Sequence, residues 1–471
     1  MGYSKLFSFD SFKSFCWYKP LIRQYKNFLV LPTRVNEFFF TESGAFFISL
    51  RKYYRSPIMK IGIIGGGLTG LTAAHALLQG HDEVDLYENM PFLGGCLSSY
   101  HIDEYWIERY YHHCFAGDAH LFSLIDEFGL SGKLEWKNGT TGYYAKDTIY
   151  PLNTPFEILK YPELSLIDKA KLALLTIRAK KTDLKALDDV SAEEFIVSRL
   201  GRNLYSSFFE PLLKSKFGDR RKEVSAAWVI SRIAIRSNRG ISGERLGYLN
   251  GGFHTLIDSL EHSIESRGGR IQKSQPATVL ERMHDKWELN GTRYDAIIST
   301  IPPRELERIG GPVLPPIPYQ GAACVTLGMS REVTKGIYWL NMKDPAPFGA
   351  VITHTNFISP ERYGEHIVYL ASYFSSSISP DTEERMLGEF CSHFSVAKEE
   401  IHWHKIAVNP WAGPVYATGY RSLIPEYEQH DLYMAGMFSL PNYPERSMEG
   451  SIQAGTEVAD KIKSGGLHDR S

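Results

Sequence analysis

The clearest hydrophobic pattern in the chain lies between residues 60 and 78. Residues 60–64 form a short run of mostly apolar, β-branched side chains, which is typical of a buried strand in a parallel sheet. Glycines follow at once, and apolar residues then recur at helical spacing at Leu71, Ala74, Leu77 and Leu78. The pattern therefore predicts a strand, a glycine turn and a helix in that order, and a second strand at residues 83–87.

Beyond this unit, helical and strand-like stretches follow one another along the chain. Helices are indicated by apolar side chains at helical spacing, and strands by short alternating or apolar runs between turn residues. The further predicted elements are a helix near 119–128 ended by Gly129, helices over 155–240, strands over 276–300 that return to the first sheet at 297–302, a second and largely antiparallel sheet within 318–375, and a helix from about Met448. The predicted fold class is α/β.

The glycine turn has the spacing of a dinucleotide-binding fingerprint, Gly65-x-Gly67-x-x-Gly70. The first glycine allows the tight turn, the second lets the backbone approach a pyrophosphate, and the third lets the helix lie close to the strand. The helix N-terminus offers N–H groups and a partial positive charge to the phosphates. Glu88 ends the second strand, where an acid hydrogen-bonds a ribose 2′-OH. An ordinary βαβ unit without a ligand is the alternative interpretation.

Residues 1–58 carry many aromatic and basic side chains but no sustained helical or strand period. Met59 and Lys60 stand directly before the first predicted strand, where many Rossmann-type proteins begin. We interpret residues 1–58 as a poorly ordered extension or an over-long start, with a peripheral membrane-binding or partner-binding arm as the alternative. Residues 466–471 are predicted to be a tail.

Composition narrows the class of protein. The 471 residues exceed what one small core needs, so two domains are expected. Basic and acidic residues number 52 and 54, and this balance gives no support for nucleic-acid binding. Five scattered cysteines lack CxxC spacing, so we expect a cytoplasmic protein without a disulfide framework or a metal site. No stretch approaches the roughly 18 uncharged apolar residues of a membrane span.

Four blocks together resemble the flavin-containing amine oxidase superfamily, which includes protoporphyrinogen oxidases, phytoene desaturases and UDP-galactopyranose mutases. The blocks are Gly65–Glu88, Gly94–Ser99, Gly247–Val279 and Ala435–Gly455. The resemblance implies an FAD-binding Rossmann-type domain, discontinuous in sequence, and an interleaved substrate domain built from helices and an antiparallel sheet. The implied segments are 59–150, 245–305 and 425–465 for the FAD-binding domain, and 151–244 and 306–424 for the substrate domain.

Carried over residue by residue, the resemblance also implies a set of cofactor contacts. The N-terminus of the helix from Met448 would point at the flavin, where its N–H groups, that of Gly450 included, would favour negative charge on the reduced ring. The implied contacts are Gly65, Gly67, Leu68, Thr69 and Gly70 at the pyrophosphate, Glu88 at the adenosine ribose, Gly94, Gly95 and Cys96 along the cofactor, the backbone of Val279 at the adenine, and Gly436, Met437, Met448, Gly450 and Ser451 at the flavin end.

Two positions depart from the usual pattern of the family. Cys96 stands where an arginine usually follows the Gly-Gly pair, and Met437 stands where an aspartate usually follows Ala-Gly. Both changes remove polar contacts to the cofactor. The C-terminal region also lacks the cysteine that tethers flavin in some members, so we expect non-covalent FAD.

The resemblance implies hydride transfer from a C–H or C–N bond of an organic substrate to the flavin, as in the protoporphyrinogen oxidase and desaturase branch. Amine oxidation is not expected, because Cys324 stands where amine oxidases carry a lysine on the strand after "IP". A single GxGxxG predicts no NADPH domain, which leaves oxygen, a quinone or another small oxidant as acceptor. The alternatives are a flavin-dependent isomerase like UDP-galactopyranose mutase, which needs arginines facing the flavin, and a non-catalytic FAD-binding protein.

Several side chains keep two interpretations at this stage. His112 and His113 are candidate acid/base or substrate-binding groups, but on a strand only one of the two would face the site, and either could be a core or surface histidine. Cys96 could be a redox thiol or a packing residue. Arg446 could contact a pyrophosphate or a substrate carboxylate, or form a loop salt bridge.

The expected partner is a small substrate, apolar or extended. The basic, amphipathic stretch at 164–181 could touch a membrane surface or be a solvated helix face. The oligomeric state is left open.

Overall fold

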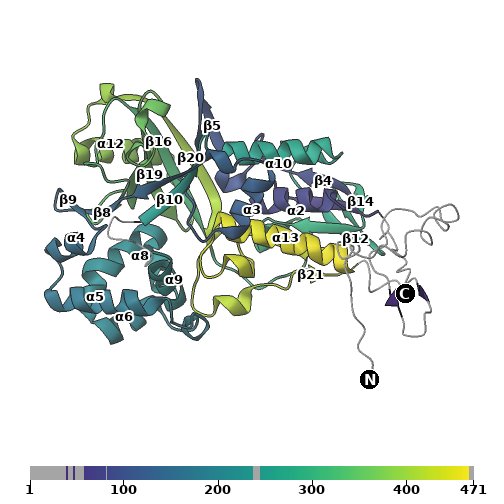
Figure 1. The fold of residues 1–471 in the computed structure, drawn as a ribbon, viewed down its shortest axis with the longest axis horizontal. Helices are drawn as coiled ribbons and strands as arrows, with labels where there is room; N and C mark the ends of the chain where they lie inside the picture. The colour runs from purple at the N-terminus through teal and green to yellow at the C-terminus, as the bar shows by residue number, and fades with distance from the viewer. Residues whose placement is uncertain (1–38, 41–45, 48–57, 81, 237–243, 466–471) are drawn as a thin grey trace, which may run out of the picture. The chain divides into compact units, whose positions relative to one another are not determined.

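The computed structural model describes residues 39–40, 46–47, 58–80, 82–236 and 244–465 (Figure 1). The chain divides into two compact units, Met1–Pro57 and Ile58–Ser471. In the first unit, β1 (Phe39–Phe40) and β2 (Phe46–Phe47) pair antiparallel. The rest of the predicted extension, and the predicted tail at 466–471, lie outside the described residues.

A six-stranded sheet joins segments that are far apart in the sequence. Its central strand, β3, pairs in parallel with β4 and β15, so the predicted return of residues 297–302 to the first sheet is confirmed at β15. Five strands are parallel, and only the edge strand β21 runs antiparallel. In their order across the sheet the strands are β11 (Arg270–Gln272), β4 (Glu83–Tyr87), β3 (Lys60–Ile64), β15 (Ala296–Ser299), β22 (Leu432–Met434) and β21 (Glu428–Gln429).

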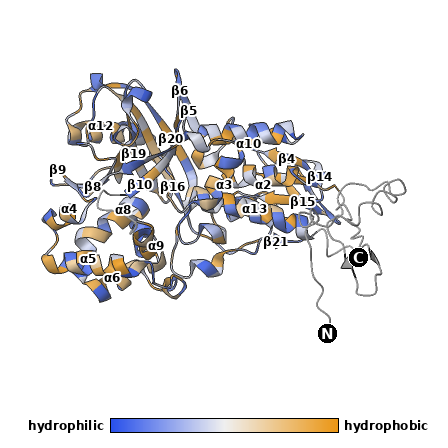
Figure 2. Cartoon of the chain, in the orientation of Figure 1, coloured by the Kyte–Doolittle hydropathy of each residue, from blue (hydrophilic) through white to orange (hydrophobic). Residues whose placement is uncertain are grey.

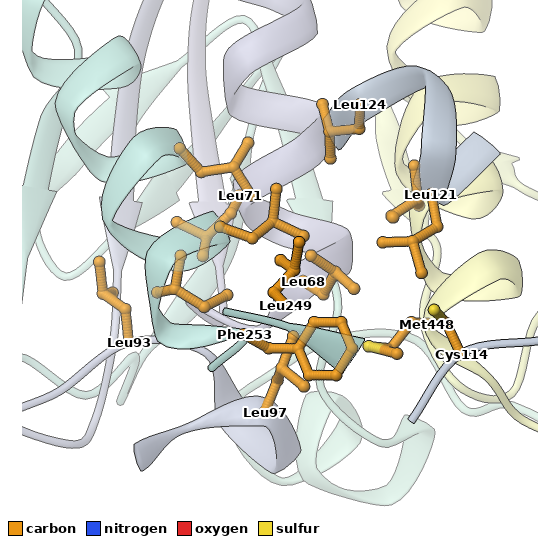
Figure 3. Close-up of a cluster of buried hydrophobic side chains, with 14 of the residues drawn as sticks. Leu68, Leu71, Leu93, Leu97, Cys114, Leu121, Leu124, Leu249, Phe253 and Met448 are labelled. Carbon is orange, nitrogen blue, oxygen red and sulfur yellow. The ribbon is translucent and has the colours of Figure 1, made fainter. Parts of the chain in front are cut away.

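The helix predicted after the glycine turn is α2 (Leu68–Leu78). Other helices pack around it. α13 (Met448–Gly465) and α10 (His254–Ser266) both lie beside α2, and α3 (Ala119–Glu127) contacts α13. Figure 3 shows the apolar side chains that fill the space between them, with Leu68, Leu71 and Leu249 close to Phe253. This core holds the start of α2 in place directly after the glycine turn.

The second sheet has seven strands and is largely antiparallel, as predicted for residues 318–375. It also contains one parallel pair, β17 with β8. β8 and all but the last residue of β9 lie within the segment 59–150 that was predicted for the FAD-binding domain, yet they pair here, because two short strands carry no local signal of their partner. In order across the sheet the strands are β20 (Ile401–Pro414), β16 (Tyr319–Met329), β19 (His366–Phe374), β18 (Ala350–Thr353), β17 (Trp339–Met342), β8 (Thr141–Ala145) and β9 (Thr148–Pro151).

The predicted helical region between residues 155 and 240 is confirmed up to Arg236, and residues 237–240 lie outside the described residues. Capping boxes start its first two helices: the N-caps Thr154 and Ser165 precede α4 and α5, and each pairs with an acid in the first turn, Glu157 in α4 and Asp168 in α5. The helices are α4 (Pro155–Lys160), α5 (Leu166–Ala179), α6 (Ala192–Leu200), α7 (Arg202–Leu204), α8 (Glu210–Phe217) and α9 (Ala226–Arg236), with a π-helical turn at Tyr205–Phe209.

Hydrophobic residues are frequent along α4 and α5 (Figure 2), and several of their large apolar side chains are exposed. Leu166, Ile167 and Ile177 are 75%, 69% and 73% exposed, and Phe156 is 63% exposed. None of the helices in the described ranges is long and apolar enough to cross a membrane.

Smaller elements complete the second unit. The remaining strands form a three-stranded meander, an antiparallel pair of strands that are far apart in the sequence, and a hairpin. They are β12 (Leu280–Met283), β13 (Lys286–Leu289) and β14 (Thr292–Tyr294), β7 (Leu134–Gly139) with β10 (Glu244–Leu249), and β5 (Ser99–Ile102) with β6 (Tyr105–Glu108); the remaining α-helices are α11 (Pro303–Arg308) and α12 (Thr382–Phe394).

Candidate functional site

A cavity of about 930 Å³ runs through the second unit, a volume at the upper end of the range for cofactor and ligand sites. The end of β3 and the start of α2 line one part of it. Strands β16 and β20 of the seven-stranded sheet, the helices α8 and α9, and the loop before α13 line the rest. The cavity therefore lies where the predicted FAD-binding and substrate segments meet.

The first glycine turn forms one end of this cavity. Gly65 has φ +105°, which favours glycine. A Cβ at Gly70 would collide with the carbonyl oxygen of Gly65, whereas a Cβ at Gly67 would meet no atom within 4 Å. Leu68 and Thr69 also line the cavity at the start of α2. The three glycines thus have three separate tasks: the turn, an open approach for a ligand, and helix packing.

The second glycine pair lies directly against the first turn. The Gly94 N–H donates to the carbonyl of Gly66 over 2.9 Å. A Cβ on Gly95 would stand 3.3 Å from the Cα of Gly67. Both Gly94 and Gly95 have positive φ, at 98° and 56°. Two glycine loops that are separated in sequence therefore build one continuous wall of backbone.

Glu88 stands beside this wall with its carboxylate held in place. One oxygen accepts the Gly66 N–H at 2.7 Å, and the other accepts the Met90 N–H, also at 2.7 Å. Each oxygen keeps a second lone pair, so the carboxylate can still accept hydrogen bonds from ribose hydroxyls. The backbone wall, the open space at Gly67 and the fixed acid fit a dinucleotide.

Four predicted contacts lie outside the cavity lining: Gly70, Val279, Gly436 and Gly450. The N–H of Val279 donates to Asn290 and its carbonyl accepts the Asn290 N–H, so its backbone is already paired; Pro276 and Ala277 line the cavity instead. A Cβ at Gly436 would press on the Thr300 carbonyl, so packing requires this glycine. Met437, next to it, does line the cavity.

The start of α13 differs from the expectation that its free N–H groups address the flavin. Met448 and Ser451 line the cavity, but the Gly450 N–H donates to the Ser447 hydroxyl over 3.0 Å and is not free. A Cβ at Gly450 would also collide with Asn442. Gly450 is therefore a packing residue, and the cap on this helix end is internal.

Both His112 and His113 line the cavity, and the prediction that only one would do so is wrong. The reason is that this segment is not a strand, so the two-residue alternation does not apply. His112 Nδ1 donates to the Tyr110 carbonyl at 2.7 Å, which leaves Nε2 as an acceptor. Burial lowers the pKa of His112 to about 4, with Arg446 adding to the effect, so the ring is neutral at pH 7. His113 Nδ1 lies 3.0 Å from the Tyr338 hydroxyl.

Two cysteines line the cavity beside the backbone wall. Cys96 receives a hydrogen bond from the Asn409 amide at 3.3 Å, and burial raises its pKa, which keeps the thiol protonated. Cys324 lies buried on β16, and burial raises its pKa as well. Protonated thiols are poor nucleophiles, so the geometry favours the packing interpretation of Cys96.

Sequence reasoning missed the charged end of the cavity. Lys216 of α8, Arg232 of α9 and the neighbours Glu445 and Arg446 all line it. Lys216 Nζ lies 2.7 Å and Arg232 Nη1 3.7 Å from Glu445 Oε1. Of these residues the sequence singles out Arg446 alone, as a possible contact to a pyrophosphate or a substrate carboxylate. No motif surrounds Lys216 or Arg232. Strand β16 has Cys324 where amine oxidases carry a lysine, but the cavity does contain a lysine, Lys216, which comes from α8.

Burial and charge shift the ionisation of this cluster. Burial lowers the pKa of Lys216 to about 7, opposed by Glu445 and assisted by the two arginines. For Glu445 burial raises the pKa, but the three cations outweigh it and bring the value to about 2. The acid therefore stays ionised throughout the neutral range.

Sequence reasoning also missed an aromatic wall and a further acid. The hydroxyl groups of Tyr111 and Tyr373 lie 3.1 Å apart, and the Tyr111 ring meets Trp339 edge-on at 4.7 Å. Burial raises the pKa of Asp118, at the start of α3, to about 6. All four residues line the cavity, and the acid is a candidate proton carrier near neutral pH.

The sequence matches the family described as flavin containing amine oxidoreductase over residues 68–463. It is 32% identical over 187 residues to zeta-carotene desaturase of Zea mays, which covers 34% of this chain and 32% of that protein. It is 22% identical over 283 residues to coproporphyrinogen III oxidase of Mycobacterium tuberculosis, which covers 54% of this chain and 61% of that protein. The chain thus spans about a third of the desaturase and about three fifths of the oxidase.

A solved structure of reduced UDP-galactopyranose mutase superposes with a TM-score of 0.67 at 18% identity, and covers 86% of this chain and 96% of the mutase. This similarity shows that the two proteins share a fold.

Proposed function

The chain belongs to the flavin containing amine oxidoreductase family, and from this premise we propose that it is an FAD-dependent oxidoreductase that takes hydride from a C–H or C–N bond of a small organic substrate. It is related to porphyrinogen oxidases and carotene desaturases. We propose that FAD is bound non-covalently. The observation that carries the proposal is the backbone wall of two glycine loops, with Glu88 fixed at its edge by two amide hydrogen bonds.

Bound flavin would supply the hydride acceptor, and the protein would supply binding, orientation and electrostatics. Gly65, Gly67 and the start of α2 would hold the pyrophosphate, and Glu88 the ribose. Neutral His112 presents Nε2 as a proton acceptor, and Asp118 can hold or release a proton near pH 6. The aromatic wall of Tyr111, Trp339 and Tyr373 would orient an apolar part of the substrate and exclude water.

The first experiment tests cofactor binding. We expect the purified full-length protein to be yellow and to release FAD on acid precipitation. Gly67→Val should lose the flavin without loss of fold, since φ is −76° at this position and the new side chain would enter open space needed by the pyrophosphate. Gly388→Val, on the exposed face of α12, is the matched control. Full flavin absorbance in Gly67→Val would overturn the assignment of this site.

A second candidate is a flavin-dependent isomerase acting on a nucleotide sugar. The observation that favours it is that Arg232 and Arg446 line the cavity, since such an enzyme needs arginines near the flavin. Turnover of a UDP-sugar by the reduced protein without any electron acceptor would support the isomerase. Dependence of turnover on an added acceptor, with stoichiometric reduction of that acceptor, would support the oxidoreductase.

A further inference from the structure

The charged end of the cavity has more positive charge than its own acid balances. Lys216, Arg232 and Arg446 face a single carboxylate, Glu445. The side chains of Lys216 and Glu445 are only 17% and 10% exposed. Buried charge without a counter-ion is costly, so such a cluster is expected where a ligand supplies the missing negative charge.

Several polar atoms of this cluster also have no hydrogen-bond partner among the described residues. They are Arg446 Nη1, Glu445 Oε2 and the indole N–H of Trp228, each of them buried. The Trp228 ring lies 5.1 Å from Lys216 Nζ and 5.7 Å from the Arg232 guanidinium. Two orphaned donors and a lysine therefore meet in one part of the cavity.

The surroundings of Arg446 show that its position is built into the fold. The side chain lies against Gly413 of β20, where a Cβ would collide with the guanidinium. The adjacent residue, Glu445, already accepts a hydrogen bond from the Lys216 ammonium, so its carboxylate is only partly available to pair with Arg446. A guanidinium held in this way presents a planar fork that suits a carboxylate or a phosphate.

We propose that Lys216, Arg232 and Arg446 form a subsite for an anionic group of the substrate, a carboxylate or a phosphate. The inference rests on the proposed function, since it assigns the substrate end of the same cavity. It also revises the expected substrate from purely apolar to amphiphilic: the anionic group lies at this cluster, and the apolar part lies along Tyr111, Trp339 and Tyr373.

The experiment uses three probes with the same chain length: octanoate, octyl phosphate and 1-octanol. Each is titrated into the full-length flavin-loaded protein, with binding followed by calorimetry and by the flavin absorption spectrum. We expect at least one anion to bind ten times more tightly than the alcohol. Comparison of octanoate with octyl phosphate identifies which anionic group the subsite takes.

Variants locate the preference. Lys216→Met and Arg446→Gln should each reduce the preference for the anion about tenfold while octanol binding stays the same, and Lys216→Arg should retain it. Lys214→Met, an exposed lysine on the same helix, is the control and should change nothing. Arg446→Gln carries the test alone if Lys216→Met does not fold.

The proposal is overturned if octanol binds as tightly as both anions, if none of the three probes binds, or if the preference survives both variants. It is also overturned if the variants lose FAD while their preference for the anions over octanol is unchanged, because the cations would then bind the cofactor and not the substrate. A protein that contains no flavin but prefers the anions in calorimetry would refute the proposed function and leave the anion subsite standing.

Discussion

The two ends of the cavity are built in opposite ways. At the proposed FAD end the wall is backbone, formed by Gly65, Gly67, Gly94 and Gly95, with one acid held by amides. At the other end the wall consists of charged side chains on α8, α9 and the loop before α13. Lys216 and its partner Glu445 are 229 residues apart in the sequence. The first end follows from short local motifs, whereas the second exists only once the whole unit has folded.

Removal of the acid at the charged end should have the largest effect. Glu445→Gln leaves Lys216 and both arginines without their counter-ion, and we expect a loss of about 3 kcal/mol in the free energy of unfolding. The urea midpoint of the full-length protein measures it. Glu193→Gln, which breaks the exposed pair with Arg202, should cost less than about 1 kcal/mol. Equal losses in the two variants would show that the cluster is not effectively buried.

The same variant predicts a change in acid stability. The pKa of Glu445 is lowered in the folded protein to about 2 from 4.5, so its stabilisation is present above pH 4.5 and is lost as the pH falls through 2. Glu445→Gln should therefore flatten the dependence of the urea midpoint on pH below 4.5. An unchanged slope would mean that other acids cause the dependence.

At the glycine end, two substitutions should separate packing from ligand binding. Gly70→Ala places a methyl group against the Gly65 carbonyl, and we expect a loss of about 2 kcal/mol in the free energy of unfolding. Gly67→Ala meets open space and should leave the stability of the flavin-free protein unchanged. Thermal unfolding of both apoproteins decides the matter, and a larger loss in Gly67→Ala than in Gly70→Ala would contradict it.

A pH titration sharpens the contrast, because Lys216 at the charged end should change its charge close to pH 7. The groups that face Lys216 are Glu445, Arg232 and Arg446. Glu445 stays ionised between pH 6 and 8, and arginine side chains are not deprotonated in proteins. Lys216, with its pKa lowered to about 7, is protonated below this pH and loses its charge above it. The affinity for octanoate should fall roughly tenfold from pH 6 to 8, as for the loss of one charged hydrogen bond of about 1.5 kcal/mol. Lys216→Arg should abolish this dependence; if it persists in that variant, another group titrates.

The smallest effect is expected on α5, where local pattern and tertiary exposure coincide. Leu166, Leu174 and Ile177 repeat at helical spacing on the exposed side. Lys169, Arg178 and Lys180 come from the same stretch, so contact with an anionic membrane surface and a solvated helix face stay the two alternatives for this helix. If α5 contacts the membrane, Ile177→Gln should lower the affinity for phosphatidylglycerol vesicles roughly fivefold, which corresponds to about 1 kcal/mol, as measured by co-sedimentation. Val313→Gln, at an equally exposed apolar site, should not; equal effects would contradict a dedicated surface.

The helices and the parallel strands around the fingerprint could be predicted because their signals are local. The run at 60–64, the glycines and the apolar spacing of α2 each specify backbone geometry within a few residues. His112 and Val279 show where this reasoning stops. The histidine segment is not the strand that its residues suggest, and the backbone of Val279 is paired with Asn290, a partner that no periodicity indicates.

The strand, glycine turn and helix at residues 60–78, and the family, can be read from the residues alone, since these depend on backbone conformation and short spacings. The packing of the whole unit is needed to join the two glycine loops into one wall, to place β8 and β9 in the second sheet, and to gather Lys216, Arg232 and Arg446 around Glu445. The physical reason is that side-chain clusters depend on long-range packing of α8, α9 and the loop before α13, and the sequence carries no local record of which elements will be neighbours.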